Sequence, residues 1–377
     1  TISFRDIVIQ ERENDLVGAS FGRGFFVLDD YSALREMTKE NLSKKGKLFK
    51  PRDAKLFKPR NSLGNTGGQF YVAKNPEYGA VFTYHLKDMP KTSKSLRIQF
   101  EKKLNSNKED VPFPGYEALS EEMNEKPASI ILTITDSEGN HIRNVKKNAS
   151  NGSGRIAWNL RHKSYYPVRA GRAQSNWWWN PSGPYVTPGQ YTANLYLENN
   201  GSVEKLDGPV EFNVKPLRAG TLEGASHDEY NSFRERISSL YIEMSKYQDE
   251  FNMMENKIQL LEKASMQLEE FSPELMKKIS DFKAKYNAFD SDTNGNDARS
   301  EIGEWDKVTI STRVQIAMQG LSTSYGPTDL NKSNLEIAEK LFKKLAADVK
   351  MFKSELETLE NEVKELNPPH LSGTGIN

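Results

Sequence analysis

One stretch of the sequence has the residue types and the spacing of a calcium-binding loop. Residues 290–301 read Asp-Ser-Asp-Thr-Asn-Gly-Asn-Asp-Ala-Arg-Ser-Glu and match the EF-hand pattern D-x-[DN]-x-[DN]-G-x5-E in every specified place. Calcium takes roughly six to eight hard oxygen ligands. The pattern therefore predicts a calcium site whose ligands are the side chains of Asp290, Asp292, Asn294 and Glu301 and the carbonyl of Asn296.

Two features leave a second interpretation of this loop open. Asp297 stands at the eighth position, where EF-hand loops usually carry an aliphatic residue, and the sequence shows no paired second hand. Asp, Asn and Gly are also the ordinary residues of a solvated connection between helices. If calcium binds here, we expect it to have a structural role rather than a sensor role.

A run of three tryptophans, Trp177, Trp178 and Trp179, is the candidate ligand-binding feature. Side chains alternate along a strand, so three consecutive rings cannot all point inward. With Tyr185 nearby, an exposed ring can stack on a sugar or on a partner protein. The alternative is that this loop folds back and caps the domain.

The sequence shows no catalytic motif. It contains no Asp-box, no Gly-x-Ser-x-Gly elbow, no P-loop and no His-Glu-x-x-His, and its five histidines have no metal-ligand spacing. Because the chain has no cysteine, disulfides, thiolate metal sites and cysteine catalysis are excluded. We therefore assign no catalytic residue and favour a non-catalytic chain, although distant loops can still assemble an active site.

The composition limits the class of partner. The 377 residues are enough for two or three domains, and the 52 Lys and Arg balance the 52 Asp and Glu. A net charge of zero argues against a nucleic-acid partner, and no apolar run is long enough for a membrane span. The charge is uneven: residues 1–110 have a basic excess and residues 223–377 an acidic excess, which suggests separate units.

The N-terminal region is expected to be a β-hairpin followed by an extended linker. Strands at 15–20 and 24–29 flank Phe21-Gly22-Arg23, within a hairpin region at 1–35. Because the chain opens directly in strand-like sequence, we expect it to be a piece of something longer. Residues 36–68 are expected to be an extended basic linker, in which Lys-Leu-Phe-Lys-Pro-Arg occurs at 47–52 and at 55–60. This linker either binds an acidic partner or crosses the protein surface with four apolar side chains tucked in, namely Leu48, Phe49, Leu56 and Phe57.

Residues 69–218 are expected to form an immunoglobulin-like or fibronectin type III-like β-sandwich, with residues 101–128 as a loop insertion. The expected strands are 69–73, 79–87, 94–100, 129–135, 141–145, 154–160, 190–197 and 209–214.

Residues 226–367 are expected to form a long antiparallel helical bundle before a flexible tail at 368–377. Apolar residues recur at helical spacing from 229 to 270, Ser272-Pro273 begins a helix, and a last helix runs over 333–366. The fold class is therefore α+β and multidomain.

Several segments together resemble one family. Residues 14–30 (Asn-Asp-Leu-Val-Gly-Ala-Ser-Phe-Gly-Arg-Gly-Phe-Phe-Val-Leu-Asp-Asp) resemble the closing blade of a BNR-repeat, sortilin-type β-propeller protein, although Phe21 stands where the family usually has His. Further segments resemble the family in the same order, at 78–87, 132–140, 156–161 and 186–191.

The resemblance implies a secreted or cell-surface, extracytoplasmic bacterial protein from a family often labelled glycosyl hydrolase. It also implies that this chain holds the last blade hairpin but lacks most of the propeller. We expect a non-catalytic structural region that docks a protein partner or the upstream propeller. The alternatives are an accessory carbohydrate-binding part of a hydrolase and a component of a bacterial envelope assembly for secretion or motility.

Overall fold

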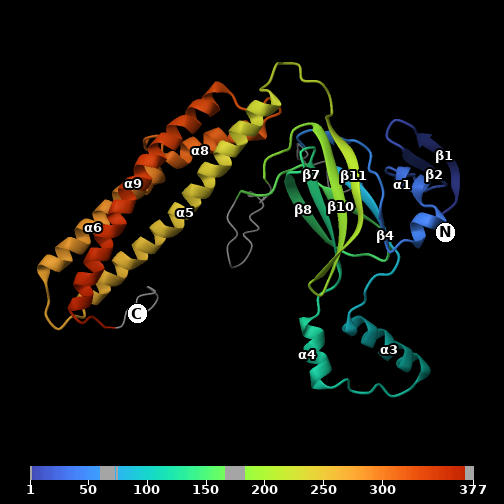
Figure 1. The fold of residues 1–377 in the computed structure, drawn as a ribbon, viewed down its shortest axis with the longest axis horizontal. Coiled ribbons are helices and arrows are strands. Elements are labelled where there is room, and N and C mark those ends of the chain that lie inside the picture. Colours follow the sequence, from blue (N-terminus) through green and yellow to red (C-terminus); the bar gives the residue numbers. More distant parts are fainter. Residues whose placement is uncertain (1, 60–72, 74, 166–182, 370–377) are drawn as a thin grey trace. The chain divides into compact units, whose positions relative to one another are not determined.

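The computed structural model describes residues 2–59, 73, 75–165 and 183–369 of the chain. These residues form a mixed α+β structure, as expected (Figure 1). It divides into two compact units, residues 1–163 with 185–219 and residues 164–184 with 220–377, and each is described by itself. The tryptophan run, residues 69–72 of the expected strand at 69–73 and residues 370–377 of the expected tail at 368–377 lie outside the described residues.

The first unit begins with a three-stranded antiparallel sheet. Its strands are β1 (Phe4–Gln10), β2 (Asp15–Ser20) and β3 (Phe25–Leu28), with β2 in the centre. The β2–β3 turn has two glycines in the left-handed region, Gly22 at φ 76° and Gly24 at φ 74°, which a side chain would disfavour. The hairpin therefore lies where the sequence predicts it.

The segment expected to be an extended linker contains regular structure. After α1 (Ser32–Glu36) come α2 (Lys39–Ser43), β4 (Gly46–Leu48) and β5 (Ala54–Leu56). The helix α2 starts because the Thr38 side chain accepts a hydrogen bond from the Asn41 amide. Each copy of Lys-Leu-Phe-Lys-Pro-Arg begins in one of the two strands. The segment thus belongs to the sheets described next.

Two sheets follow, and the two repeat copies enter different ones. A five-stranded sheet has the order β5-β11-β10-β7-β8, and a three-stranded sheet has the order β4-β6-β9. β4 is antiparallel to β6, whereas β5 is parallel to β11. The strands are β6 (Ala80–Leu86), β7 (Ser129–Asp136), β8 (His141–Asn148), β9 (Gly152–Trp158), β10 (Gly189–Asn199) and β11 (Ser202–Pro216).

Both sheets contribute to one hydrophobic core. β6 alternates buried and half-buried residues along its whole length, so one face of it points into the core. Phe82 from the smaller sheet packs edge-on against Phe212 from the larger one, with ring centroids 5.1 Å apart. Trp158 is fully buried, and its indole Nε1 donates to the carbonyl of Arg161 at 2.9 Å. Leu48 and Phe49 of the first repeat copy are also fully buried.

The expected strand at 94–100 is wrong, and the expected loop at 101–128 contains helix. The segment forms α3 (Ser93–Asn107) and α4 (Tyr116–Asn124). The Thr92 side chain accepts from the Ser95 amide and caps α3. Arg97 then pairs with Glu101 one turn later, at 2.6 Å. These local interactions favour helix over the alternating apolar pattern.

The second unit is a helical bundle that contains the three predicted long helices and further short helices that the sequence did not predict. The helices of the bundle are α5 (His227–Ser265), α6 (Pro273–Thr293), α7 (Asp297–Glu301), α8 (Ile310–Gln319), the 3-10 turn η1 (Gly320–Ser322) and α9 (Asp329–Glu365). Ser272 caps α6 with Pro273 at its first turn, as predicted. Among the described residues, no helix is both long and apolar enough to cross a membrane.

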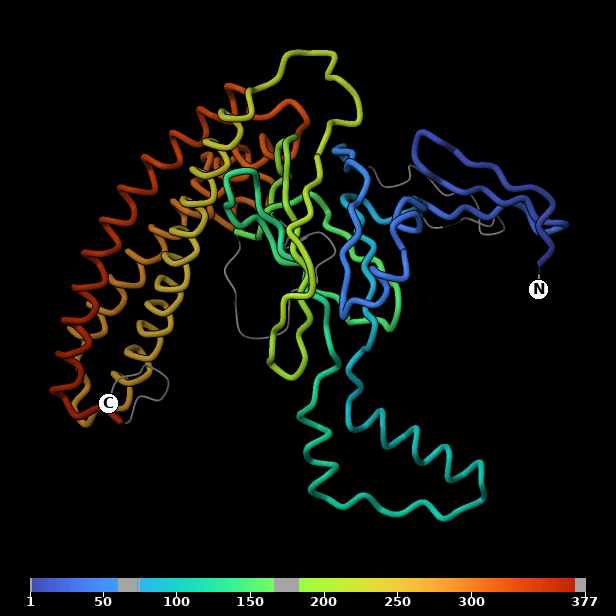
Figure 2. The backbone as a smooth tube through the Cα atoms, turned by 45° about the vertical axis from the view of Figure 1, so that its right-hand side comes forward, coloured from blue at the N-terminus to red at the C-terminus, as the bar shows by residue number. Residues whose placement is uncertain are grey.

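The ion pairs define the directions of the helices. Pairs between α5 and α9 keep the same order along both helices, as in Arg236–Glu339 and Lys257–Glu360, so these two run parallel. Pairs between α6 and α9 run in opposite order, as in Lys278–Glu362 and Lys285–Glu355. Consecutive long helices are therefore antiparallel, as expected, while the first and last are parallel (Figure 2).

Two shorter helices, α6 and α8, share the length of α9. α6 packs beside the C-terminal half of α9, whereas α8 packs beside its N-terminal part, where Asn331 donates to the carbonyl of Ile316 at 2.6 Å. α6 and α8 thus pack along α9 in succession, with a break at residues 294–309 between them. The candidate calcium loop lies at this break.

Candidate functional site

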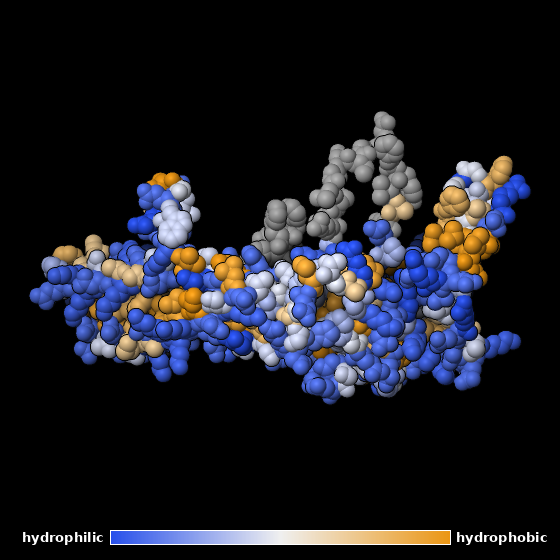
Figure 3. Space-filling model, turned by 90° about the horizontal axis from the view of Figure 1, so that it is seen from above, coloured by the Kyte–Doolittle hydropathy of each residue, from blue (hydrophilic) through white to orange (hydrophobic). Residues whose placement is uncertain are grey.

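The sheet β1–β3 carries the most continuous set of exposed apolar side chains on its strands. Figure 3 shows hydrophobic side chains gathered at the right of the view, where this sheet lies. The exposed residues are Phe4, Ile7, Val8 and Ile9 on β1, Phe21 in the β2–β3 turn, and Phe25, Phe26, Val27 and Leu28 on β3. Contiguous apolar surface of this kind on a soluble protein marks an interaction site.

Both faces of this sheet are apolar. Neighbouring residues on a strand point to opposite faces, and the consecutive Ile7 and Val8 are 59% and 57% exposed. The same holds on β3, where Phe26 and Val27 are 42% and 54% exposed. A sheet with one wet face alternates apolar and polar residues, whereas a sheet covered on both faces reads as a continuous apolar run. The sequence of β1 and β3 therefore suits a sheet that lies between two other layers.

The edges of the sheet are also open to pairing. Within the part of the chain that the structure describes, β1 and β3 each have one strand neighbour, which is β2. An edge strand presents unpaired amide and carbonyl groups that a further strand can bind. The sheet thus offers two apolar faces and two edges.

Polar contacts hold the base of this sheet to the rest of its unit. Arg52 donates to the Glu13 carbonyl at 3.0 Å and lies 3.7 Å from the Asp15 carboxylate. Arg155 donates to the carbonyls of Asp29 and Asp30. Arg52, the last residue of the first copy of Lys-Leu-Phe-Lys-Pro-Arg, is therefore paired with acidic residues of its own unit.

Other basic residues of the linker are used in the same way. Lys47 pairs with Asp207 at 2.8 Å, and Lys45 pairs with Glu204. Both acidic residues lie on β11. These pairs join the segment to β11 of the same unit. Leu48 and Phe49 are buried, as the surface-crossing interpretation expects, whereas Phe57 is 42% exposed.

Tyr185 is the one described member of the predicted ligand-binding set, because Trp177, Trp178 and Trp179 lie outside the described residues. Its ring is half-buried, with the Arg161 guanidinium 3.7 Å from the ring centroid and the Tyr78 ring edge-on at 6.4 Å. Burial raises the pKa of Tyr78 to about 12, and its hydroxyl donates to the Phe57 carbonyl at 2.6 Å. Tyr185 thus has one ring face covered by Arg161.

The predicted calcium ligands lie at the end of α6 and just after it. Asp290 and Asp292 are in the last turn of the helix, and Asn294 is its C-cap. The Asn294 amide group donates to the Asp290 carboxylate at 2.7 Å, and Asp292 pairs with Lys307. The first half of the loop therefore has helical backbone.

The second half of the loop is the start of α7. The Asn296 side chain caps that helix by accepting from the Ala298 amide at 3.0 Å, and Glu301 ends it. The Asn296 amide in turn donates to Asp306, and this hydrogen bond lowers the pKa of Asp306. The described residues contain no cluster of three or more acidic or histidine side chains able to hold a metal ion, and calcium binding stays a prediction.

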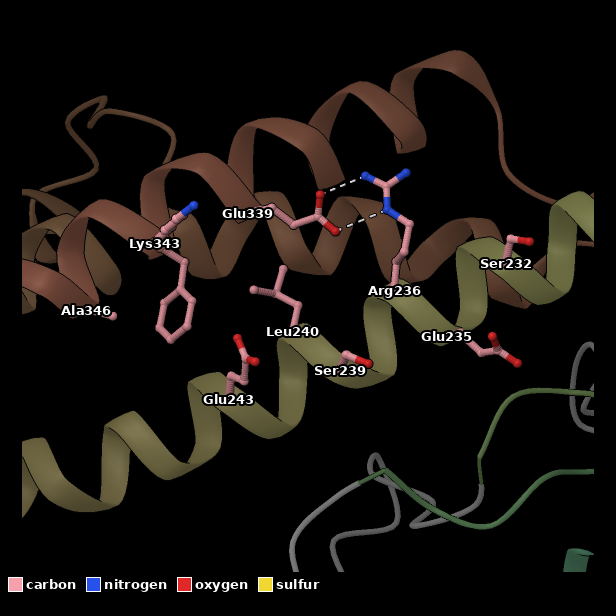
Figure 4. Close-up of a pocket in the computed structure, with 10 residues that line it drawn as sticks. Ser232, Glu235, Arg236, Ser239, Leu240, Glu243, Glu339, Lys343 and Ala346 are labelled. Carbon is pink, nitrogen blue, oxygen red and sulfur yellow. Dashed lines mark hydrogen bonds and ion pairs between the residues drawn. The ribbon is translucent and has the colours of Figure 1, made fainter.

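A shallow groove of ≈ 760 Å³ runs between α5 and α9 (Figure 4). Leu240 and Phe342 form its floor and belong to the bundle core. Arg236 reaches across it to Glu339 with two hydrogen bonds of 3.1 and 2.7 Å. The groove follows from the packing of two parallel helices, and a salt bridge spans it.

Comparison with family models, with curated proteins and with solved structures gives no match. The likeness to a BNR-repeat propeller protein therefore rests on the sequence segments alone. Sequence reasoning located the strands of β1–β3 but missed their exposure. The signal was present in Ile7-Val8-Ile9 and Phe25-Phe26-Val27-Leu28, which are continuous apolar runs rather than alternating ones.

Proposed function

We propose that this chain is a non-catalytic docking region of a secreted or cell-surface β-propeller protein of the BNR-repeat, sortilin type. In this proposal β1–β3 belongs to the last blade of the propeller. The two-sheet domain and the helical bundle then form the part that follows the propeller, and we propose an immunoglobulin-like sandwich for the former.

The observation that supports the proposal is the exposure of apolar side chains on both faces of β1–β3. In a β-propeller, blades of about four strands are arranged around an axis, so each blade packs between two neighbours and both of its faces are buried. A sheet of three strands with two apolar faces matches a blade without its neighbours. The fourth strand of such a blade would pair with the free edge of β1 or of β3.

The alternative of a carbohydrate-binding accessory part depends on Trp177, Trp178 and Trp179, which lie outside the described residues. The alternative of an envelope assembly depends on partners that a pull-down from the native envelope identifies.

Hydrogen–deuterium exchange tests the proposal when the chain alone is compared with the intact protein isolated from its source. We expect an intact mass far above 42.8 kDa. We also expect the edge amides of β1 and β3 to exchange quickly in the chain alone and slowly in the intact protein. Amides of β10, which is central in its sheet, serve as the control and are protected in both. A native mass near 42.8 kDa, or equal exchange of β1 in both samples, contradicts the proposal.

A further inference from the structure

The helical hairpin of α3 and α4, residues 92–125, has a second apolar surface that the proposed function does not use. Neither helix contains a buried residue. Several of its large apolar side chains are exposed, namely Leu96 by 52%, Phe100 by 55%, Phe113 by 64%, Tyr116 by 83% and Met123 by 87%, whereas Leu104 and Leu119 are half-buried. We refer to this hairpin as the helical arm.

Polar contacts link the two helices of the arm. Arg97 on α3 donates to both carboxylate oxygens of Glu122 on α4, at 2.7 and 2.8 Å. The Ser93 amide donates to Glu125 at 2.6 Å. Hydrogen bonds from Arg97 lower the pKa of Glu122, so this clamp stays ionised at neutral pH. Polar side chains thus supply contacts that join α3 to α4.

Helical spacing places apolar side chains beside the clamp on each helix. Leu96 and Phe100 are one turn apart on α3 and adjoin the face that carries Arg97. Tyr116 and Met123 are two turns apart on α4 and adjoin the face that carries Glu122. Each helix thus presents an apolar stripe that lies outside the contact between the two.

The two limbs of the arm carry opposite charge. Residues 92–108 have five basic residues and one acidic residue, a net charge of 5 − 1 = +4, while residues 109–125 have six acidic residues and no basic one, a net charge of −6. Lys102 and Lys103 on the first limb and Glu117 and Glu121 on the second are exposed. This surface is complementary to itself, because a basic limb and an acidic limb are both present on each copy.

We propose that the helical arm is a self-association surface, on which α3 of one copy packs against α4 of a second copy of this chain. In a twofold arrangement the basic limb of each copy meets the acidic limb of the other, so both favourable contacts form together. The same arrangement covers apolar stripes on both copies. A different protein could complement the charges of both limbs at once only if it carried the same pattern of one basic and one acidic limb.

The size of the arm sets the expected affinity. α3 has 15 residues, so it is about 22 Å long, and two adjacent helices are about 20 Å wide. One face therefore buries about 440 Å² on each copy, or about 900 Å² in total, which is the size of a weak interface. We expect a dissociation constant in the micromolar range that rises with salt, because salt screens exposed charges.

Analytical ultracentrifugation of the full chain, from about 1 to 200 µM, tests this proposal across a micromolar dissociation constant. We expect a monomer–dimer equilibrium. The double variant Lys102→Glu with Lys103→Glu, and separately Glu117→Lys with Glu121→Lys, should each weaken the dimer at least tenfold. Arg97 and Glu122 are unchanged in both variants, and circular dichroism checks that the arm remains helical.

The decisive measurement is an equimolar mixture of these two double variants. In the mixed dimer the unchanged basic limb of one variant faces the unchanged acidic limb of the other, and the reversed positions 102/103 and 117/121 again bring opposite charges together. Dimers of unlike chains should therefore form, although each variant alone is monomeric. Phe100→Ser with Met123→Ser tests the apolar stripes without changing charge and should also weaken the dimer. A monomeric wild type at the highest concentration overturns the proposal. A failure of folded variants to recover dimers on mixing also overturns it.

The control variant Phe25→Ser with Val27→Ser alters the exposed sheet and should leave the equilibrium unchanged. If this variant abolishes association and the limb reversals do not, the copies meet through β1–β3 and the arm proposal fails. Because the two surfaces are separate, the result is independent of the proposed blade role.

Discussion

Lys257 on α5 donates to Glu360 on α9 at 2.9 Å, and the two residues are 103 positions apart. The same separation recurs in Arg236–Glu339 and in Lys353–Glu250. A constant separation means that the two helices run parallel and in register over most of their length. These ion pairs therefore define the register between α5 and α9.

Lys257→Met should destabilise the bundle by about 2 kcal/mol, because Glu360 is buried and loses one of its two cationic partners. The Glu360 side chain is only 7% exposed, and its other partner is Lys364 at 3.3 Å. Urea unfolding followed by circular dichroism measures the change. Lys353→Met is the matched control, since its partner Glu250 is 60% exposed, and it should leave the midpoint unchanged.

The double variant Lys257→Met with Glu360→Met should recover most of the lost stability, because two apolar side chains replace the buried pair. Equal losses for Lys257→Met and Lys353→Met contradict the assignment of a buried pair.

Phe49→Ala should destabilise the first unit by about 3 to 5 kcal/mol, whereas Phe57→Ala should cost much less. The two residues hold the same place in the two copies of Lys-Leu-Phe-Lys-Pro-Arg, but Phe49 is fully buried and Phe57 is 42% exposed. Thermal unfolding of both variants makes the comparison. Similar melting temperatures for the two show that the linker does not insert Phe49 into the core.

Gly79→Ala should sharply lower the yield of folded protein. Gly79 has φ +113°, and an added Cβ would lie 2.0 Å from the carbonyl oxygen of Trp158. This oxygen is a backbone atom, so it cannot move aside without displacing the strand. Gly139→Ala is the control, because Gly139 has φ +85° with open space around it. It should cost only about 1 to 2 kcal/mol of backbone strain. Soluble expression and melting temperature compare them, and a well-folded Gly79→Ala variant argues against this β6–β9 packing.

Asp207 should make the first unit less stable in acid. Burial raises the pKa of this carboxyl, but hydrogen bonds from Lys47 and from the amides of Leu48 and Gly208 outweigh burial and hold the pKa below its ordinary value of 3.8. The folded state thus favours the ionised form, and its contribution is complete above that value. It is lost as the pH falls through the lower pKa of the folded state.

The variant Asp207→Asn should lower the unfolding free energy by about 1 kcal/mol at neutral pH, since one charged hydrogen-bond acceptor is removed. Its deficit should shrink as the pH falls below 3.8, because the wild type then loses the same charge. Urea unfolding at several pH values measures both. A deficit that does not change with pH means that the ionised carboxylate does not stabilise the linker.

Local physical signals in the sequence were enough to locate most elements. Ser272-Pro273 predicted the start of α6, because a side-chain cap and a fixed φ act within one turn of the helix. Alternating apolar residues predicted β7 and β10, since one face of each is buried. The alternating apolar residues Leu96, Ile98 and Phe100 fit the strand expected at 94–100, but this segment is part of α3. The Thr92 cap and the Arg97–Glu101 pair favour helix there.

Only the tertiary structure decided which elements meet. The two copies of Lys-Leu-Phe-Lys-Pro-Arg are identical in sequence, yet one enters the smaller sheet and the other the larger sheet, because their partners β6 and β11 lie far along the chain. The parallel pairing of α5 and α9 likewise depends on the intervening helices. Exposure also required the tertiary structure. The apolar runs of β1 and β3 indicate a sheet whose two faces need cover, but only the structure shows that these side chains are exposed among the described residues.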